Sequence, residues 1–210
     1  MKNIKPLLDE SSSHHDHLCP RQILGVRIGL AGADALDLEP KQPGKRLLVI
    51  LESDGCFADG VIAATDCTVG HRTLRVEDYG KVAATFVDVK NGRAVRVAPV
   101  NDIRQLACSN TPEESRHYFA QMQAYQTLPE DKLFTFTEVQ LTRPIEQIVS
   151  HPGLRVECTL CDEEIINERE IILEGKPYCI PCAQGGYYRS VPKMVLSERE
   201  ELHEKAVVPA

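Results

Sequence analysis

The sequence predicts an α+β protein with a small cysteine-rich module near its C-terminal end. Helix and strand patterns are mixed, but a hairpin signal at Asn91-Gly92 interrupts regular strand–helix alternation. This favours a core with a mixed or antiparallel sheet over a doubly wound one. Four of the eight cysteines stand in two close pairs after residue 157, and 210 residues are enough for one sizeable domain and one small one.

The first predicted element is a helix that begins at Pro20, within CPRQILGVRIGLAGADALDL, where apolar residues recur at helical spacing. Proline suits a first turn because the N–H that it lacks would have no helical acceptor there. Three glycines interrupt the pattern. Because glycine permits close approach of another backbone, we expect them to mark tight packing; they are Gly25, Gly29 and Gly32.

The middle of the chain is predicted to hold the sheet. RLLVILESD indicates a buried strand, and CFADGVIAATDCT indicates a short helix from near Cys56 to near Asp66. KVAATFVDV and RAVRVAP are expected to pair as a hairpin, and LFTFTEVQL alternates like a further strand. Between them, Thr111 is expected to cap a helix in residues 111–128, with Glu114 at the capping-box position.

These elements divide the chain into four parts. Residues 1–143 are expected to form the α+β core, and the proline-containing residues 144–153 a linker. Residues 154–190 are expected to form the cysteine-rich module, and residues 191–210 a charged tail.

The module has the spacing of a zinc site. Cys158-x2-Cys161 and Cys179-x2-Cys182 are separated by seventeen residues, and REIILEGKPYC between them predicts a hairpin turning near Gly175. Four thiolates arranged in this way suit tetrahedral zinc, which predicts a treble-clef or ribbon-like finger. Redox-active pairs and an iron–sulfur centre are the alternatives. The module carries four basic and seven acidic residues, so protein contact is favoured over nucleic acid.

Composition excludes several classes of protein. The longest aliphatic run, LLVIL, is far shorter than the roughly 20 residues that cross a bilayer, and a formal charge of −7 disfavours phosphate binding. The N-terminal MKNIKPLLDESSS has no apolar segment of signal-peptide length, so a cytoplasmic protein without membrane contact is expected. Eight cysteines there indicate metal ligands or reactive thiols rather than disulfides.

A second metal site is predicted in the core. Cys19 and Cys56 each stand at the start of a predicted helix, where the dipole and free N–H groups are expected to lower a thiol pKa. His17 and Cys19 lie two residues apart in an extended approach, so both side chains face the same way. Together with Cys67 these four residues are predicted to bind zinc, while His15 is a ligand or a proton carrier. The alternative is a histidine-rich terminus with unrelated buried cysteines.

Three stretches of the core then match a known family. HHDHLCPRQILGVRIG, ESDGCFADGVIAATDCTVGH and VEDYGKVAATFVDV resemble the His-x-His-x-Cys-Pro, Asp-x-Cys-x-x-Asp, Gly/Asp-Cys-Thr-x-Gly and Asp-Tyr-Gly-Lys motifs of the formylmethanofuran dehydrogenase E-subunit family. The resemblance covers about residues 14 to 140, and the finger is similar to one that some members append. It implies a core related to the catalytic-domain fold of glyceraldehyde-3-phosphate dehydrogenase, a homodimer, and a zinc pocket at His15, His17, Cys19, Cys56 and Cys67.

Three functions remain open. The first is an accessory protein of a molybdenum or tungsten formylmethanofuran dehydrogenase, or of a related formate-oxidising system in one-carbon metabolism, whose finger contacts the oxidoreductase subunits. The second is an enzyme acting on a small molecule, with Cys19 or Cys56 as the thiolate and His15 or His17 as the proton-transfer group. The third is a zinc-finger regulator of nucleic acid, which the acidic finger disfavours.

Overall fold

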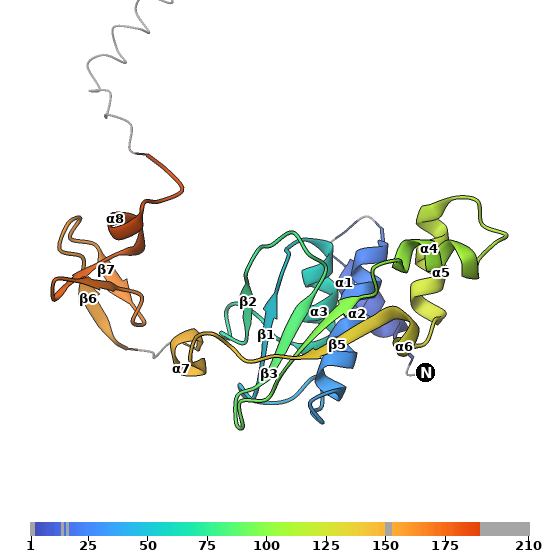
Figure 1. Cartoon of the computed structure of the whole chain (residues 1–210), viewed down its shortest axis with the longest axis horizontal. Coiled ribbons are helices and arrows are strands. Elements are labelled where there is room, and N and C mark those ends of the chain that lie inside the picture. The colour runs from blue at the N-terminus through green and yellow to red at the C-terminus, as the bar shows by residue number, and fades with distance from the viewer. Residues whose placement is uncertain (1–2, 14, 16, 150–152, 190–210) are drawn as a thin grey trace, which may run out of the picture. The chain divides into compact units, whose positions relative to one another are not determined.

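The computed structural model describes residues 3–13, 15, 17–149 and 153–189. The chain forms two compact units, residues 1–150 and residues 151–210, and the charged tail expected at 191–210 lies outside the described residues. The first unit is a mixed α+β structure, as predicted (Figure 1). None of the helices in the described ranges is long and apolar enough to cross a membrane.

A five-stranded mixed sheet organises the first unit, in the order β2-β1-β3-β4-β5. β1 and β2 run parallel, and the other neighbours are antiparallel. At the centre of the sheet Phe86 lies opposite Val49 on one side and Val95 on the other, which fixes the register of three buried strands. The strands are β1 (Leu47–Leu51), β2 (Leu74–Val76), β3 (Ala84–Asp88), β4 (Ala94–Pro99) and β5 (Phe134–Glu138).

Seven helices accompany the sheet in the described part of this unit. α2 and α3 begin where the sequence predicts, at Pro20 and Cys56, and α3 connects the parallel strands β1 and β2 (Figure 1). α1, α4, α6 and α7 were not anticipated. The helices are α1 (Lys5–Ser12), α2 (Pro20–Asp34), α3 (Cys56–Thr65), α4 (Ile103–Asn110), α5 (His117–Thr127), α6 (Glu130–Leu133) and α7 (Ile145–Ile148).

The helical glycines pack α2 directly against its neighbours, as expected. A Cβ at Gly25 would lie 2.3 Å from the Phe57 carbonyl oxygen, and one at Gly60 would lie 2.3 Å from the Gln22 carbonyl oxygen. A Cβ at Gly32 would overlap the Phe86 ring at 2.1 Å. The glycine faces of α2 and α3 are therefore filled within one chain, so the glycines lend no support to a dimer interface.

Both faces of the sheet are covered. The main core joins α2 and α3 to one face through fully buried side chains such as Ile23, Phe57 and Phe86. A smaller cluster on the other face is centred on Leu48, Val87 and Ala94, and the apolar residues of α7 pack against it. The first part of the stretch expected to be a linker thus packs against the sheet.

The prediction that Thr111 caps the start of a helix is wrong. The chain instead forms two helices, and Thr111 follows the end of α4. Its buried hydroxyl donates to the Ala107 carbonyl oxygen at 3.0 Å. Thr111 therefore bonds to the last turn of the preceding helix and does not cap the start of the next one. Glu114 pairs with Arg116 in the connecting turn, and α5 begins only at His117. Thr-Pro-Glu-Glu is here a turn between helices.

The second unit holds two hairpins and one short helix. β6 (Arg155–Glu157) pairs with β7 (Glu164–Ile166), and β8 (Ile171–Leu173) pairs with β9 (Lys176–Tyr178), both antiparallel. The predicted turn at Gly175 is present, with φ of 76°. Helix α8 (Ile180–Gln184) follows directly.

Candidate metal centre and a cavity in the core

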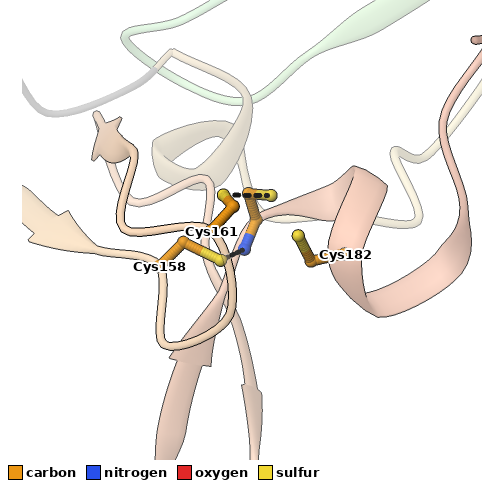
Figure 2. Close-up of side chains that lie close together, drawn as sticks. Cys158, Cys161 and Cys182 are labelled. Atoms are coloured by element: carbon orange, nitrogen blue, oxygen red, sulfur yellow. Dashed lines mark hydrogen bonds between the residues drawn. The ribbon is translucent and has the colours of Figure 1, made fainter. Parts of the chain in front are cut away.

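The four paired cysteines of the second unit converge, as the spacing predicts. The sulfurs of Cys158, Cys161, Cys179 and Cys182 all lie within 4.8 Å of one another (Figure 2). The Sγ atoms of Cys161 and Cys179 are 3.8 Å apart. A tetrahedron with metal–sulfur bonds of about 2.3 Å has edges of about 3.8 Å, so the group fits a single zinc ion.

Backbone geometry supports negative charge at this cluster. The backbone N–H of Cys179 donates to the Cys158 sulfur at 3.3 Å, and this contact holds the pKa of the Cys158 thiol at about 6. The hydrogen bond with Cys179 instead raises the pKa of Cys182. Because thiolates repel one another, four ionised cysteines this close together require a cation to balance their negative charge. The first cysteine pair lies in the turn between β6 and β7, and the second begins directly after β9, so the two hairpins bring the pairs together.

Two thiols also meet in the first unit. Cys19 stands at the N-cap of α2 and Cys56 at the first position of α3, and the two thiols are hydrogen-bonded to each other. The Cys19 backbone N–H donates to the buried Gln22 side chain at 2.7 Å, and Gln22 donates to the Ser11 carbonyl oxygen at 2.8 Å. These bonds fix Cys19 between α1 and α2.

The expected lowering of the Cys56 pKa is not found. Burial, followed by the hydrogen bond and the charge of Cys19, raises the pKa of Cys56. Desolvation of a thiolate therefore outweighs the free N–H groups at the start of α3. Cys56 is a protonated thiol at neutral pH unless a cation approaches it.

The remaining residues of the predicted core site lie at different places. His15 contacts Asp59, in the first turn of α3, with Nε2 to Oδ2 of 2.8 Å, and His17 is exposed. Cys67 is buried beyond the other end of α3, its sulfur 3.6 Å from the Leu47 carbonyl oxygen. Ten helical residues rise about 15 Å, so Cys67 is too distant from Cys56 to share one ion with it.

The Cys19–Cys56 pair opens onto a cavity of about 490 Å³. Its walls come from α2, α3, α4, α5 and the ends of strands. Sequence reasoning missed the contribution of α4 and α5, although Tyr118, Gln121 and Tyr125 recur at helical spacing and so share one face of α5. The polar residues that line the cavity are Cys19, Arg21, Cys56, Arg104, Tyr118, Gln121 and Tyr125.

Comparison with known proteins identifies relatives of the chain. A family model described as "FmdE, Molybdenum formylmethanofuran dehydrogenase operon" matches residues 14–135. A protein of Archaeoglobus fulgidus named "Probable S-adenosyl-L-methionine-binding protein" is 28% identical over 221 aligned residues, which cover 94% of this chain. The match covers 58% of that relative, so the chain spans little more than half its length.

A solved structure shares the fold. The crystal structure of a tungsten formylmethanofuran dehydrogenase FmdE-like protein from Syntrophus aciditrophicus aligns with a TM-score of 0.52 and 22% sequence identity. The alignment covers 88% of this chain and 94% of the other.

Proposed function

The chain belongs to the FmdE family, and from that premise we propose that it is a metal-binding accessory protein of a formylmethanofuran dehydrogenase or a related formate-oxidising system. The observation that carries the proposal is the convergence of four cysteine sulfurs within 4.8 Å of one another. In this proposal the second unit is a zinc finger that holds the protein against a partner subunit. We also propose that the core is related to the catalytic-domain fold of glyceraldehyde-3-phosphate dehydrogenase. The proposed location is the cytoplasm, whose reducing conditions suit free thiols.

Zinc is the proposed metal because four thiolates select soft or borderline cations over magnesium or calcium. A closed four-sulfur site leaves no position for a substrate, so the ion has a structural role. The second unit is small, and much of its apolar surface is exposed. Metal binding therefore supplies the free energy that a larger core would otherwise provide.

Partner contact is supported by the surface of the second unit. Small units seldom leave so many large apolar side chains in solvent unless another surface covers them. The net charge of this unit is acidic, which favours a protein partner over nucleic acid. The exposed residues are Leu154, Leu160, Ile166, Ile172, Leu173, Ile180, Tyr187 and Tyr188.

Metal analysis of the full chain tests the proposal. Cys179→Ser should release one zinc per chain and collapse the amide signals of residues 153–189, because three thiolates hold the ion less tightly than four. Cys108→Ser, on α4 in the first unit, is the matched control and should keep both the zinc and the signals. Full zinc content in the Cys179 variant would contradict the proposal.

A homodimer is also proposed, since closed two-fold dimers are the commonest assembly. The glycines of α2 are already used within the chain, so another surface must form the interface. Sedimentation of the full chain at micromolar concentration should give the mass of two chains. A monomer would overturn this part of the proposal and leave the zinc finger untouched.

A second candidate function is an enzyme or binding protein for a small molecule. It is favoured by the cavity of about 490 Å³ beside the Cys19–Cys56 pair, and by the name of the Archaeoglobus relative. In this role Cys19 is the proposed nucleophile. His15, which contacts Asp59 one turn of α3 beyond Cys56, is the proposed proton carrier. Loss of small-molecule binding on Cys19→Ala with unchanged zinc content distinguishes this candidate from the first.

A further inference from the structure

The cavity beside Cys19 has apolar walls and a cationic rim. Leu24, Val82, Pro99 and Ile103 supply aliphatic surface, and none of the described residues that line the cavity carries a carboxylate. This is unusual in a chain with a formal charge of −7. A cavity with this lining fits a ligand that has an apolar body and a negatively charged group.

The two arginines of the lining are free to bind a ligand. Four other arginines in the described part of the first unit already have carboxylate partners, as in Arg46–Asp88 and Arg96–Glu52. Within the described residues, Arg21 and Arg104 form neither an ion pair nor a hydrogen bond. Each carries five donors in a planar fork that matches a carboxylate or a phosphate.

An almost fully buried residue with a hydroxyl group, Tyr125, lines the same cavity. Tyr125 is 1% exposed, yet its phenol oxygen has no hydrogen-bond partner among the residues that the structure describes. Every fully sealed side-chain oxygen or nitrogen in those ranges has a partner, so this oxygen keeps a small contact with solvent, and Tyr125 is one of the residues that line the cavity. Burial raises the pKa of Tyr125 to about 12, which keeps the hydroxyl protonated as a donor, and Arg104 lies close enough to act on it.

We propose that this cavity binds an organic anion, with the carboxylate or phosphate held by Arg104 and the Tyr125 hydroxyl and the apolar body against Leu24, Val82 and Ile103. Arg21, at the start of α2, adds positive charge near the Cys19–Cys56 pair. Tyr118 is already oriented by its hydrogen bond to the Leu18 carbonyl oxygen at 3.0 Å, so it forms a fixed wall. The site deepens the small-molecule candidate and does not depend on the finger, its zinc or a partner subunit.

The test uses three probes of similar body and different charge, titrated into the zinc-loaded full chain and followed by amide chemical shifts. They are 4-phenylbutyrate, 3-phenylpropyl phosphate and the neutral 4-phenylbutanamide. At least one anion should shift the amides of Arg21, Arg104 and Tyr125 and bind at least about fivefold more tightly than the neutral amide. The anion that binds better identifies the group, carboxylate or phosphate, that the site prefers.

Two variants separate anion recognition from general apolar binding. Tyr125→Phe removes an oxygen that has no partner in the described structure and leaves the packing intact, so the fold should persist while anion affinity falls about tenfold. Arg104→Gln should do the same, and neither should alter binding of the neutral amide. Arg143→Gln, an exposed arginine outside the cavity, is the control and should match the wild type.

The proposal is overturned if none of the probes shifts the cavity amides, or if the anions and the neutral amide bind equally. It is also overturned if both variants bind the anion as tightly as the wild type. None of these results bears on zinc content, so the accessory-protein proposal stands or falls separately.

Discussion

Replacing Gly25 with Ala tests the contact between α2 and α3, on which the position of both core thiols depends. The added Cβ would lie 2.3 Å from the Phe57 carbonyl oxygen, 0.7 Å inside the 3.0 Å that real Cβ contacts almost never cross. It would also lie 2.9 Å from the Gly60 Cα. Because both neighbours are backbone atoms, no side chain can rotate away, and the two helices must move apart.

The energetic outcome is a balance of two terms. Alanine gains up to about 1 kcal/mol over glycine in a helix interior, whereas overpacking a close contact costs about 1–3 kcal/mol or more. Contact with rigid backbone places this case at the upper end, so we expect a net loss of about 2 kcal/mol. In a chain of this size that loss lowers Tm by roughly 4–8 °C.

Thermal unfolding of the full chain, followed by circular dichroism, measures the effect. Gly70→Ala is the matched control, because a Cβ there meets no atom within 4 Å and its φ is not positive. Gly60→Ala should lose a similar amount, and the double variant should lose less than the sum because both changes relieve one contact. If Gly25→Ala unfolds within 1 °C of the wild type, the reasoning about backbone contact is wrong.

Two further predictions concern single buried groups. Asp88 accepts two hydrogen bonds from Arg46, which hold the pKa of its carboxyl below the usual range, so its contribution to stability is present above about pH 4 and is lost as the pH falls through its folded-state pKa. Asp88→Asn should lower the free energy of unfolding, measured in urea, by about 1–3 kcal/mol at pH 7. It should have no effect at a pH where the wild-type carboxyl is protonated, and a difference that stays constant across pH would refute this. Gln22→Ala should cost about 2–4 kcal/mol, because the Cys19 N–H loses its acceptor, and should speed labelling of Cys19 by a thiol reagent; an unchanged labelling rate would argue against its positioning role.

Local signals account for the parts of the fold that could be predicted. Pro20 and Asn91-Gly92 act within a few residues of themselves, and they correctly placed the start of α2 and the β3–β4 hairpin. Thr111 was misread because its hydroxyl has two local options, and only packing decides that it bonds backwards to Ala107. Propensity cannot rank such alternatives, since tertiary contacts choose between them.

The candidate sites divide in the same way. The spacing of the finger cysteines specifies a metal site because the two members of each pair are three positions apart, one pair in the β6–β7 turn and the other at the start of α8, and the convergence of all four sulfurs was predicted. In the core, the length of α3 was predicted correctly, and that length alone separates Cys56 from Cys67. Arg104 and Tyr125 come from helices about 70 residues or more beyond α2, and nothing in the local sequence indicates that they line the same cavity as Cys19.

The close packing of α2 has a consequence for hydrogen exchange. Most of its residues are buried, including its glycines, so amides in its middle can exchange with solvent only when the whole unit unfolds. In its first turn Pro20 has no N–H, and the amides of Gln22 and Ile23 donate to the Cys19 carbonyl oxygen. The Arg21 amide has no acceptor among the described residues, and Arg21 lines the cavity, so this amide exchanges through small local openings. A bound ligand that covers the cavity would slow exchange of the Arg21 amide and leave the amides in the middle of α2 unchanged, so the ratio of the two exchange rates reports how much of the cavity is occupied.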